Sequence, residues 1–174
     1  MKRVLIALLA LMVCANLASA NGLGFFGSYW KLEDADDGGF GGGAKLQMSF
    51  GDYVALELRG TYFPDLMGTE PKLTAVPVEI GLIVLLPLSE TVKPFFGGGP
   101  GYYMFDIEDG EVDDNLGWYA LAGVQVGLGE HAAFFANGKY TSIEATVKGD
   151  DLGEVEDMDK ITGFGGDVGL MFTW

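Results

Sequence analysis

The stretch AKLQMSFGDYVALELRGTY, residues 44–62, holds the pattern that decides the fold. Apolar side chains alternate with polar ones on both sides of a central Gly-Asp pair. Successive side chains of an extended strand point to opposite faces, so each half has an apolar face and a face that carries charged residues such as Lys45, Glu57 and Arg59. A Gly-Asp pair between two such segments predicts a β-hairpin. The stretch therefore predicts antiparallel strands whose two faces differ sharply in polarity.

The same two-residue period recurs along the chain and predicts eight strands. It is clearest in residues 76–84, 118–128 and 167–174, where Val, Leu, Ile, Phe and Trp occupy one face. Residues 93–106 and 132–142 are less regular because glycines and polar residues interrupt the phase. Most of these segments approach or exceed the ~9–11 residues that a tilted strand needs to cross a bilayer. Eight strands of this length can close into a barrel.

Residues 23–33 form the remaining strand, and adjacent aromatic residues leave its facing ambiguous. We place Trp30 and Leu32 outward, with Tyr29 and Lys31 inward. The charged residues of the polar faces are then Lys31, Lys45, Glu57, Arg59, Glu79, Lys139 and Asp167. Aromatic residues near the predicted strand ends suit the girdles found at membrane interfaces, namely Trp30, Tyr62, Tyr103, Trp118, Tyr140 and Trp174.

The connections between strands alternate between short and long. Short turns at residues 51–52, 86–91 and 129–131 contrast with long segments at residues 33–42, 64–72, 106–117 and 143–160, which hold most of the acidic residues. Short periplasmic turns, long outer loops and an even strand number are the arrangement of bacterial outer-membrane barrels. The sequence therefore predicts acidic loops on the extracellular side.

The N-terminus has the features of a secretory signal peptide. Two basic residues precede an apolar run over residues 4–15, and Ala-Ser-Ala at 18–20 matches a cleavage site. The run is shorter than the ~20 residues that a spanning helix needs. We therefore expect residues 1–20 to be a cleaved signal and residues 21–174 to form one barrel domain. The only cysteine, Cys14, falls in the signal, so the remaining chain has no disulfide chemistry.

The polar face decides between a membrane barrel and a soluble one. A soluble lipocalin-like barrel has an apolar interior, whereas an outer-membrane barrel turns its apolar face to lipid and its polar face to the lumen. In water the apolar band of this chain would be a large aggregation-prone patch. The membrane barrel is therefore favoured, and its candidate lumen charge cluster comprises Lys45, Glu57, Arg59, Glu79, Lys139 and Asp167.

Two stretches resemble small eight-stranded outer-membrane barrels of the OmpA/OmpX, OmpW and opacity-protein families. VKPFFGGGPGYYMF, residues 92–105, is similar to a Pro-aromatic-Gly-x-Gly strand of these families, and GGDVGLMFTW, residues 165–174, is similar to their C-terminal assembly signal. The resemblance implies that the outer-membrane insertion machinery recognises Val168, Leu170, Phe172 and Trp174. Trp stands where Phe is usual at the last position.

Candidate chemical sites are few. His131, the single histidine, is expected to be a solvated turn residue, and we expect no catalytic centre and no cofactor. Clustered carboxylates can bind calcium, and Asp34, Asp36, Asp109 and Asp113 are weak candidates because their spacing departs from a standard calcium loop. A net charge of −15 and a pI near 4.1 oppose nucleic-acid binding.

The expected function is structural or interactive, in an integral outer-membrane barrel of a Gram-negative bacterium. Expected partners are outer-membrane lipid, lipopolysaccharide and an extracellular partner of the acidic loops. One alternative is a narrow porin-like channel or a carrier of small hydrophobic molecules, in which Phe40, Leu66, Met67 and Leu152 would close over the lumen. A further alternative is a soluble ligand-binding barrel. An eight-stranded lumen is just wide enough for side chains to fill it, so we expect a filled interior.

Overall fold

A computed structural model of the protein describes residues 22–33, 37–66, 73–89, 91–107, 110–111, 115–144 and 160–174. These residues form β-strands, turns and bends, and no helix among them is long and apolar enough to cross a membrane. The strands are β1 (Gly22–Leu32), β2 (Gly39–Phe50), β3 (Val54–Tyr62), β4 (Leu73–Leu85), β5 (Val92–Ile107), β6 (Gly110–Glu111), β7 (Asn115–Gly127), β8 (Ala132–Glu144) and β9 (Lys160–Thr173).

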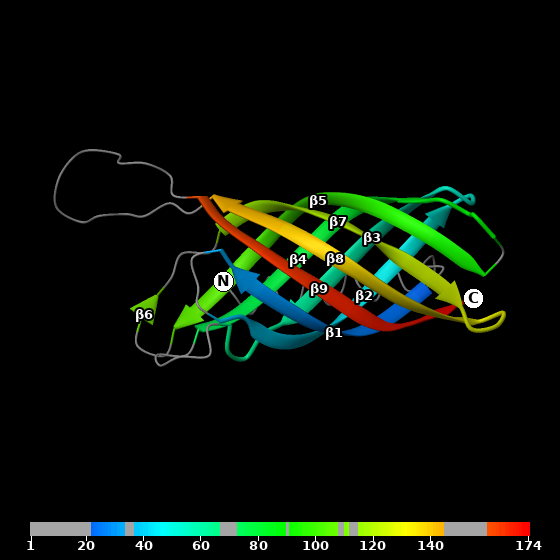
Figure 1. The fold of residues 1–174 in the computed structure, drawn as a ribbon. Helices are drawn as coiled ribbons and strands as arrows, with labels where there is room; N and C mark the ends of the chain where they lie inside the picture. The colour runs from blue at the N-terminus through cyan, green and yellow to red at the C-terminus, as the bar shows by residue number, and fades with distance from the viewer. Residues whose placement is uncertain are drawn as a thin grey trace.

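Eight of these strands close into an antiparallel barrel (Figure 1). The hydrogen-bonded order is β4-β3-β2-β1-β9-β8-β7-β5, and pairing of β4 with β5 completes the ring. The first and last strands meet along their length, from Gly22 opposite Thr173 to Leu32 opposite Gly163. The two-residue β6 extends the end of β5 as a small hairpin and stands outside the ring. The predicted closed eight-stranded barrel is confirmed.

The two ends of the barrel differ. The turns that join β2 to β3 and β7 to β8, at residues 51–53 and 128–131, lie at the same end as the C-terminus, while β6 lies at the other end (Figure 1). Gly51 adopts a φ of 74°, a left-handed conformation that glycine reaches without a Cβ penalty. This conformation explains why glycine occupies the first position of the turn over residues 51–53. The end with these turns is called the short-turn end below.

The alternation predicted from the sequence sets the two faces of the wall. Val168 and Phe172 are 56% and 50% exposed on the outer surface of β9. By contrast, Glu57 and Arg59 are each 1% exposed inside the barrel. The apolar rows therefore face outward and the ionic residues face the axis, as the argument for a membrane barrel requires.

The predicted facing of the first strand is wrong. Trp30 is 1% exposed inside the barrel and Leu32 packs against the same interior cluster, whereas Tyr29 is 37% exposed on the outer face. Lys31 shares the outward phase of Tyr29, so it does not join the lumen charges. The cause is packing inside the barrel. The centroid of the Trp30 ring lies 5.5 Å from the centroid of the Phe63 ring, in the half of the lumen away from the short-turn end.

Two further expectations need correction. The sequence predicts Tyr103 in the interfacial girdle together with Trp30, but Tyr103 is buried in the lumen, while Tyr62, Trp118 and Trp174 are exposed on the outer surface. Several strands also run further than predicted. In particular, β2 begins at Gly39, so the segment expected to be a loop over residues 33–42 is shorter. The predicted signal peptide, residues 1–20, lies outside the described residues.

Candidate functional site

Six charged side chains from five strands meet inside the barrel and form its charged layer, which consists of Lys45, Glu57, Arg59, Glu79, Lys139 and Asp167. Each is at least nine-tenths buried. Their positions follow from strand pairing, because Arg59 of β3 lies opposite Lys45 of β2 on one side and opposite Glu79 of β4 on the other. The register thus places the inward side chains of neighbouring strands next to each other.

Arg59 is the centre of the layer. Its Nη2 donates to Oδ2 of Asp167 at 2.5 Å, and the bond crosses the lumen because β3 and β9 are not neighbours in the sheet. Its Nε lies 3.4 Å from Oε2 of Glu79, and its Nη1 lies 3.6 Å from Oε1 of Glu57. These two contacts are ion pairs without hydrogen-bond geometry. The guanidinium also lies 4.8 Å from the ring centroid of Phe26.

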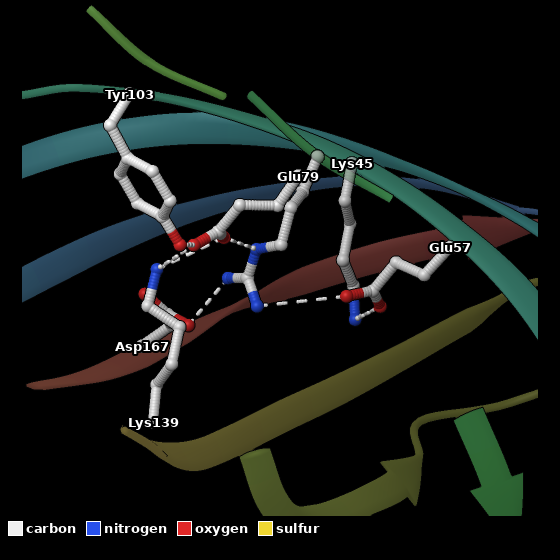
Figure 2. Close-up of polar contacts among 7 residues, drawn as sticks. Lys45, Glu57, Glu79, Tyr103, Lys139 and Asp167 are labelled. Carbon is white, nitrogen blue, oxygen red and sulfur yellow. Dashed lines mark hydrogen bonds and ion pairs between the residues drawn. The ribbon is translucent and has the colours of Figure 1, made fainter. Parts of the chain in front are cut away.

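Two lysines complete the network (Figure 2). Lys139 Nζ donates to both carboxylate oxygens of Glu79 at 3.0 Å, and the Tyr103 hydroxyl donates to Oε1 of the same carboxylate at 2.9 Å. Lys45 Nζ donates to Oε2 of Glu57 at 2.9 Å. The same ammonium lies 3.7 Å from the ring centroid of Phe135, a cation–π contact. Each carboxylate of the layer therefore contacts at least one cation.

The layer is electrically balanced. It holds three cations and three carboxylates, so the formal charges cancel within it. Burying an isolated charge is very costly, and pairing offsets that cost only when geometry and hydrogen bonds are good. A selectivity filter made of side chains carries a ring of one sign of charge. A balanced and closely paired layer is instead the arrangement of a packed interior.

Apolar side chains fill the lumen on both sides of the charged layer. Toward the short-turn end, Ala55 precedes Glu57 on β3, and it belongs to an apolar cluster with Phe26, Ile83, Leu85, Phe95, Tyr119, Leu121, Phe135 and Met171. Toward the other end lies an outer apolar cluster of Trp30, Phe63, Leu66, Ala75, Tyr103, Phe105 and Ile143. Along the barrel axis, the charged layer therefore lies between two apolar clusters.

Sequence reasoning placed three residues of this interior elsewhere, namely Trp30, Leu32 and Tyr103. Tyr103 contributes a hydrogen bond to Glu79, and its ring lies 5.9 Å from that of Trp30, between centroids. A usable signal for β1 was Ser28, a small polar residue in the same phase as Phe26 and Trp30, and the structure buries all three. In β5 both faces contain glycine and aromatic residues, so the sequence held no equivalent signal there.

The other candidate sites lie apart from this interior. His131 is exposed in the turn between β7 and β8. The weak calcium candidates, Asp34, Asp36, Asp109 and Asp113, lie outside the described residues. Within the described part of the chain, no group of three or more His, Cys, Asp or Glu side chains is placed to hold a metal ion.

The predicted assembly signal lies on the outer face of β9 and at the residue after it. Val168, Leu170, Phe172 and Trp174 are all exposed there. The structure thus presents their side chains to the surroundings of the barrel rather than to its interior.

The chain matches a family profile described as Outer membrane protein beta-barrel domain over residues 4–172. Its fold is similar to that of Neisserial surface protein A, with a TM-score of 0.71 and 13% identity over 88% of this chain and 96% of that one. It is also similar to the outer membrane protein OprG from Pseudomonas aeruginosa, with a TM-score of 0.62 and 18% identity over 90% and 97% of the two chains. For Ail, the attachment invasion locus protein of Yersinia pestis, the TM-score is 0.56, with 12% identity over 88% and 95%. No curated protein is significantly similar in sequence.

Proposed function

Because the chain belongs to the outer membrane protein beta-barrel domain family, we propose that it is an integral outer-membrane protein with a structural or surface-interaction role. In this proposal residues 1–20 direct export and are cleaved after Ala20, and residues 21–174 form the barrel. The insertion machinery recognises the C-terminal strand. The acidic loops face the outside of the cell, where they meet an extracellular partner. The protein has no catalytic role.

The observation that carries the proposal is the filled lumen. A conducting pore needs a continuous polar path, whereas here the charged layer lies between two apolar clusters. The six charges of the layer are engaged with one another, from Lys45 with Glu57 at one side to Lys139 with Glu79 at the other. The lumen therefore serves as the core of the protein, and the surfaces left for function are the outer wall and the loops.

Planar-bilayer recordings test this proposal. We expect the wild-type protein to give no stable conductance steps. Stable steps that disappear or change size in Arg59→Ala or Glu79→Ala would refute the filled lumen. Lys93→Ala is a matched control. Lys93 lies at the short-turn end in a polar hollow, which Gln47, Gln125 and Thr173 also line, and it contributes nothing to the charged layer.

A carrier of small hydrophobic molecules is the second candidate, and the outer apolar cluster favours it. Leu66 is buried in that cluster, while Phe40 is exposed and faces outward. Met67 and Leu152 lie outside the described residues. A carrier must open this cluster to its ligand. Uptake of a hydrophobic fluorophore into vesicles that increases in Leu66→Ala would support the carrier, and equal uptake in both proteins would oppose it.

A further inference from the structure

The outer wall has a hollow where β1, β7, β8 and β9 lie side by side. Its volume is about 600 Å³. Small outward residues form its floor, namely Gly27, Ala122, Ala136, Gly138 and Gly166, and the larger outward side chains that also line it are Tyr29, Phe40, Val124 and Val168. A smaller hollow of about 200 Å³ lies over β1, β2, β3 and β4, where the outward Gly60 is bordered by Leu58 and Val78. The hollow over β1, β7, β8 and β9 is the larger of these two recesses in the wall.

Packing within the chain does not explain two of these glycines. A Cβ built on Gly27 or Gly138 would meet no atom within 4 Å. Inward glycines behave differently, since a Cβ on Gly169 would lie 2.7 Å from the Cβ of Phe26 and would also strike the backbone oxygen of Phe25. The barrel could thus accept larger side chains at Gly27 and Gly138 without internal rearrangement. The hollow is a property of the outer surface and not a by-product of the core.

Aromatic side chains border the hollow toward the end opposite the short turns. The rings of Trp118, Tyr140 and Phe164 form a row across β7, β8 and β9, with centroid distances of 5.4 and 5.0 Å. Tyr140 lies two residues beyond Gly138, and Phe164 lies two residues from Gly166 along β9. Rows of Trp and Tyr mark the level of the lipid headgroups on a membrane barrel. The hollow therefore lies just below the headgroups, in the hydrocarbon of the outer leaflet.

Something must occupy this hollow in a membrane, because water is excluded there and an empty space forfeits contacts on its lining atoms. A second copy of the chain fits it poorly. In a two-fold dimer the same patch of each subunit meets its counterpart, and a two-fold axis along the membrane normal keeps equal heights together. The hollow of one subunit would then face the hollow of the other, and neither would be filled. A single acyl chain can enter such a recess and gain contacts on several sides.

We propose that this hollow binds an acyl chain of lipopolysaccharide whose phosphate lies beside Lys31. Lys31 is two residues beyond Tyr29 on the outward face of β1 and pairs in register with Phe164, so it lies at the level of the aromatic row. A lysine at headgroup level attracts lipid phosphate. The smooth glycine floor holds the chain, and the cation above it selects a lipid that bears phosphate.

The inference rests on the proposed function only in placing the outer wall in the membrane. Conductance of the lumen plays no part in it. If bilayer recordings reveal a pore, the lipid site is unaffected, and if lipid is not retained, the filled lumen is unaffected. The two proposals can therefore fail separately.

Native mass spectrometry tests the site after the protein is inserted into phosphatidylethanolamine vesicles that contain bis-phosphorylated lipid A and is then released in mild detergent. We expect the wild type to retain lipid A. The double variant Gly27→Leu with Gly138→Leu fills the hollow and should retain about tenfold less, a loss equivalent to about 1.4 kcal/mol. The matched control is Gly60→Leu, since Gly60 faces outward on β3 in the smaller hollow and its Cβ would meet no atom within 4 Å.

Retention of lipid A by the double variant at the wild-type level would overturn the proposal. So would a wild-type dimer that becomes a monomer in the double variant, because the hollow would then be a contact between copies. Lys31→Gln should reduce retention of bis-phosphorylated lipid A and leave retention of dephosphorylated lipid A unchanged. An equal loss of both lipids would overturn the phosphate contact.

Discussion

Replacement of Arg59 by Met removes the side chain that joins the charged layer across the lumen, and we expect it to destabilise the barrel strongly. Arg59 contacts the carboxylates of Asp167, Glu79 and Glu57 at 2.5, 3.4 and 3.6 Å. Met is unbranched and flexible, so it fills much of the vacated space. The main effect is therefore electrostatic, because two cations are left to balance three carboxylates.

The expected loss of stability depends on which cation each carboxylate still contacts in the variant. Glu79 retains Lys139 at 3.0 Å and Glu57 retains Lys45 at 2.9 Å, whereas Asp167 loses its short ion pair. Loss of one partner from a buried ion pair costs about 3–5 kcal/mol, since an uncompensated charge stays buried. We expect Arg59→Met to lower the free energy of unfolding by that amount.

Urea titration of protein refolded into phosphatidylcholine vesicles measures this free energy, with heat-modifiable gel mobility reporting the closed barrel. The decisive comparison uses Arg59→Met, Asp167→Asn and the double variant. The double variant has equal numbers of buried cations and carboxylates, so it should recover about 1–3 kcal/mol relative to the sum of the single losses. Lys93→Met is the control, because Lys93 lies in the polar hollow at the short-turn end, outside the charged layer.

A cost below about 1 kcal/mol for Arg59→Met would refute the reasoning, because such a value is typical of solvent-exposed ion pairs. Strict additivity in the double variant would also contradict it, because the contact between Arg59 and Asp167 would then contribute nothing. A recovery in the double variant without any change in conductance would show that the layer acts as core packing.

Three further predictions concern single positions. Tyr103→Phe removes the hydroxyl that donates to Glu79 at 2.9 Å and should cost about 1 kcal/mol in the same urea assay, because the carboxylate keeps its lysine. Gly101→Ala should reduce the yield of heat-modifiable barrel, since its Cβ would lie 2.8 Å from the buried Tyr103 ring, whereas Gly60→Ala should leave the yield unchanged. Trp174→Ala should lower the amount of protein in the outer-membrane fraction and Trp174→Phe should preserve it; equal amounts would contradict a recognition role.

The sequence predicted the fold well wherever one residue type marked one face. In β3, Glu57 and Arg59 alternate with Leu56 and Leu58, and a one-residue slip would put two charges into lipid. That penalty fixes the phase of the strand. It also explains why the inward position of these charged residues follows from the amino-acid pattern alone.

The details of the interior could not be predicted in the same way. In β1 the adjacent Tyr29 and Trp30 are both acceptable at a membrane interface, so alternation alone gives no preference between them. The choice depends on space across the lumen, where Trp30 packs against Phe63 and Phe105 from other parts of the wall. The partner of each charge likewise depends on the closed ring, because Arg59 meets Asp167 only after β3 and β9, three strands apart in the ring, face each other across the lumen.

The pairing of β1 with β9 has a consequence for biogenesis. β1 can pair early with β2, but its other neighbour, β9, is the last strand to be exported, so the barrel cannot close until translocation of the whole chain is complete. Until then the two terminal strands expose unpaired amide and carbonyl groups, which lipid cannot satisfy. A chain cut short before β9 would therefore leave two unpaired strand edges. These edges distinguish an incomplete molecule from a closed barrel.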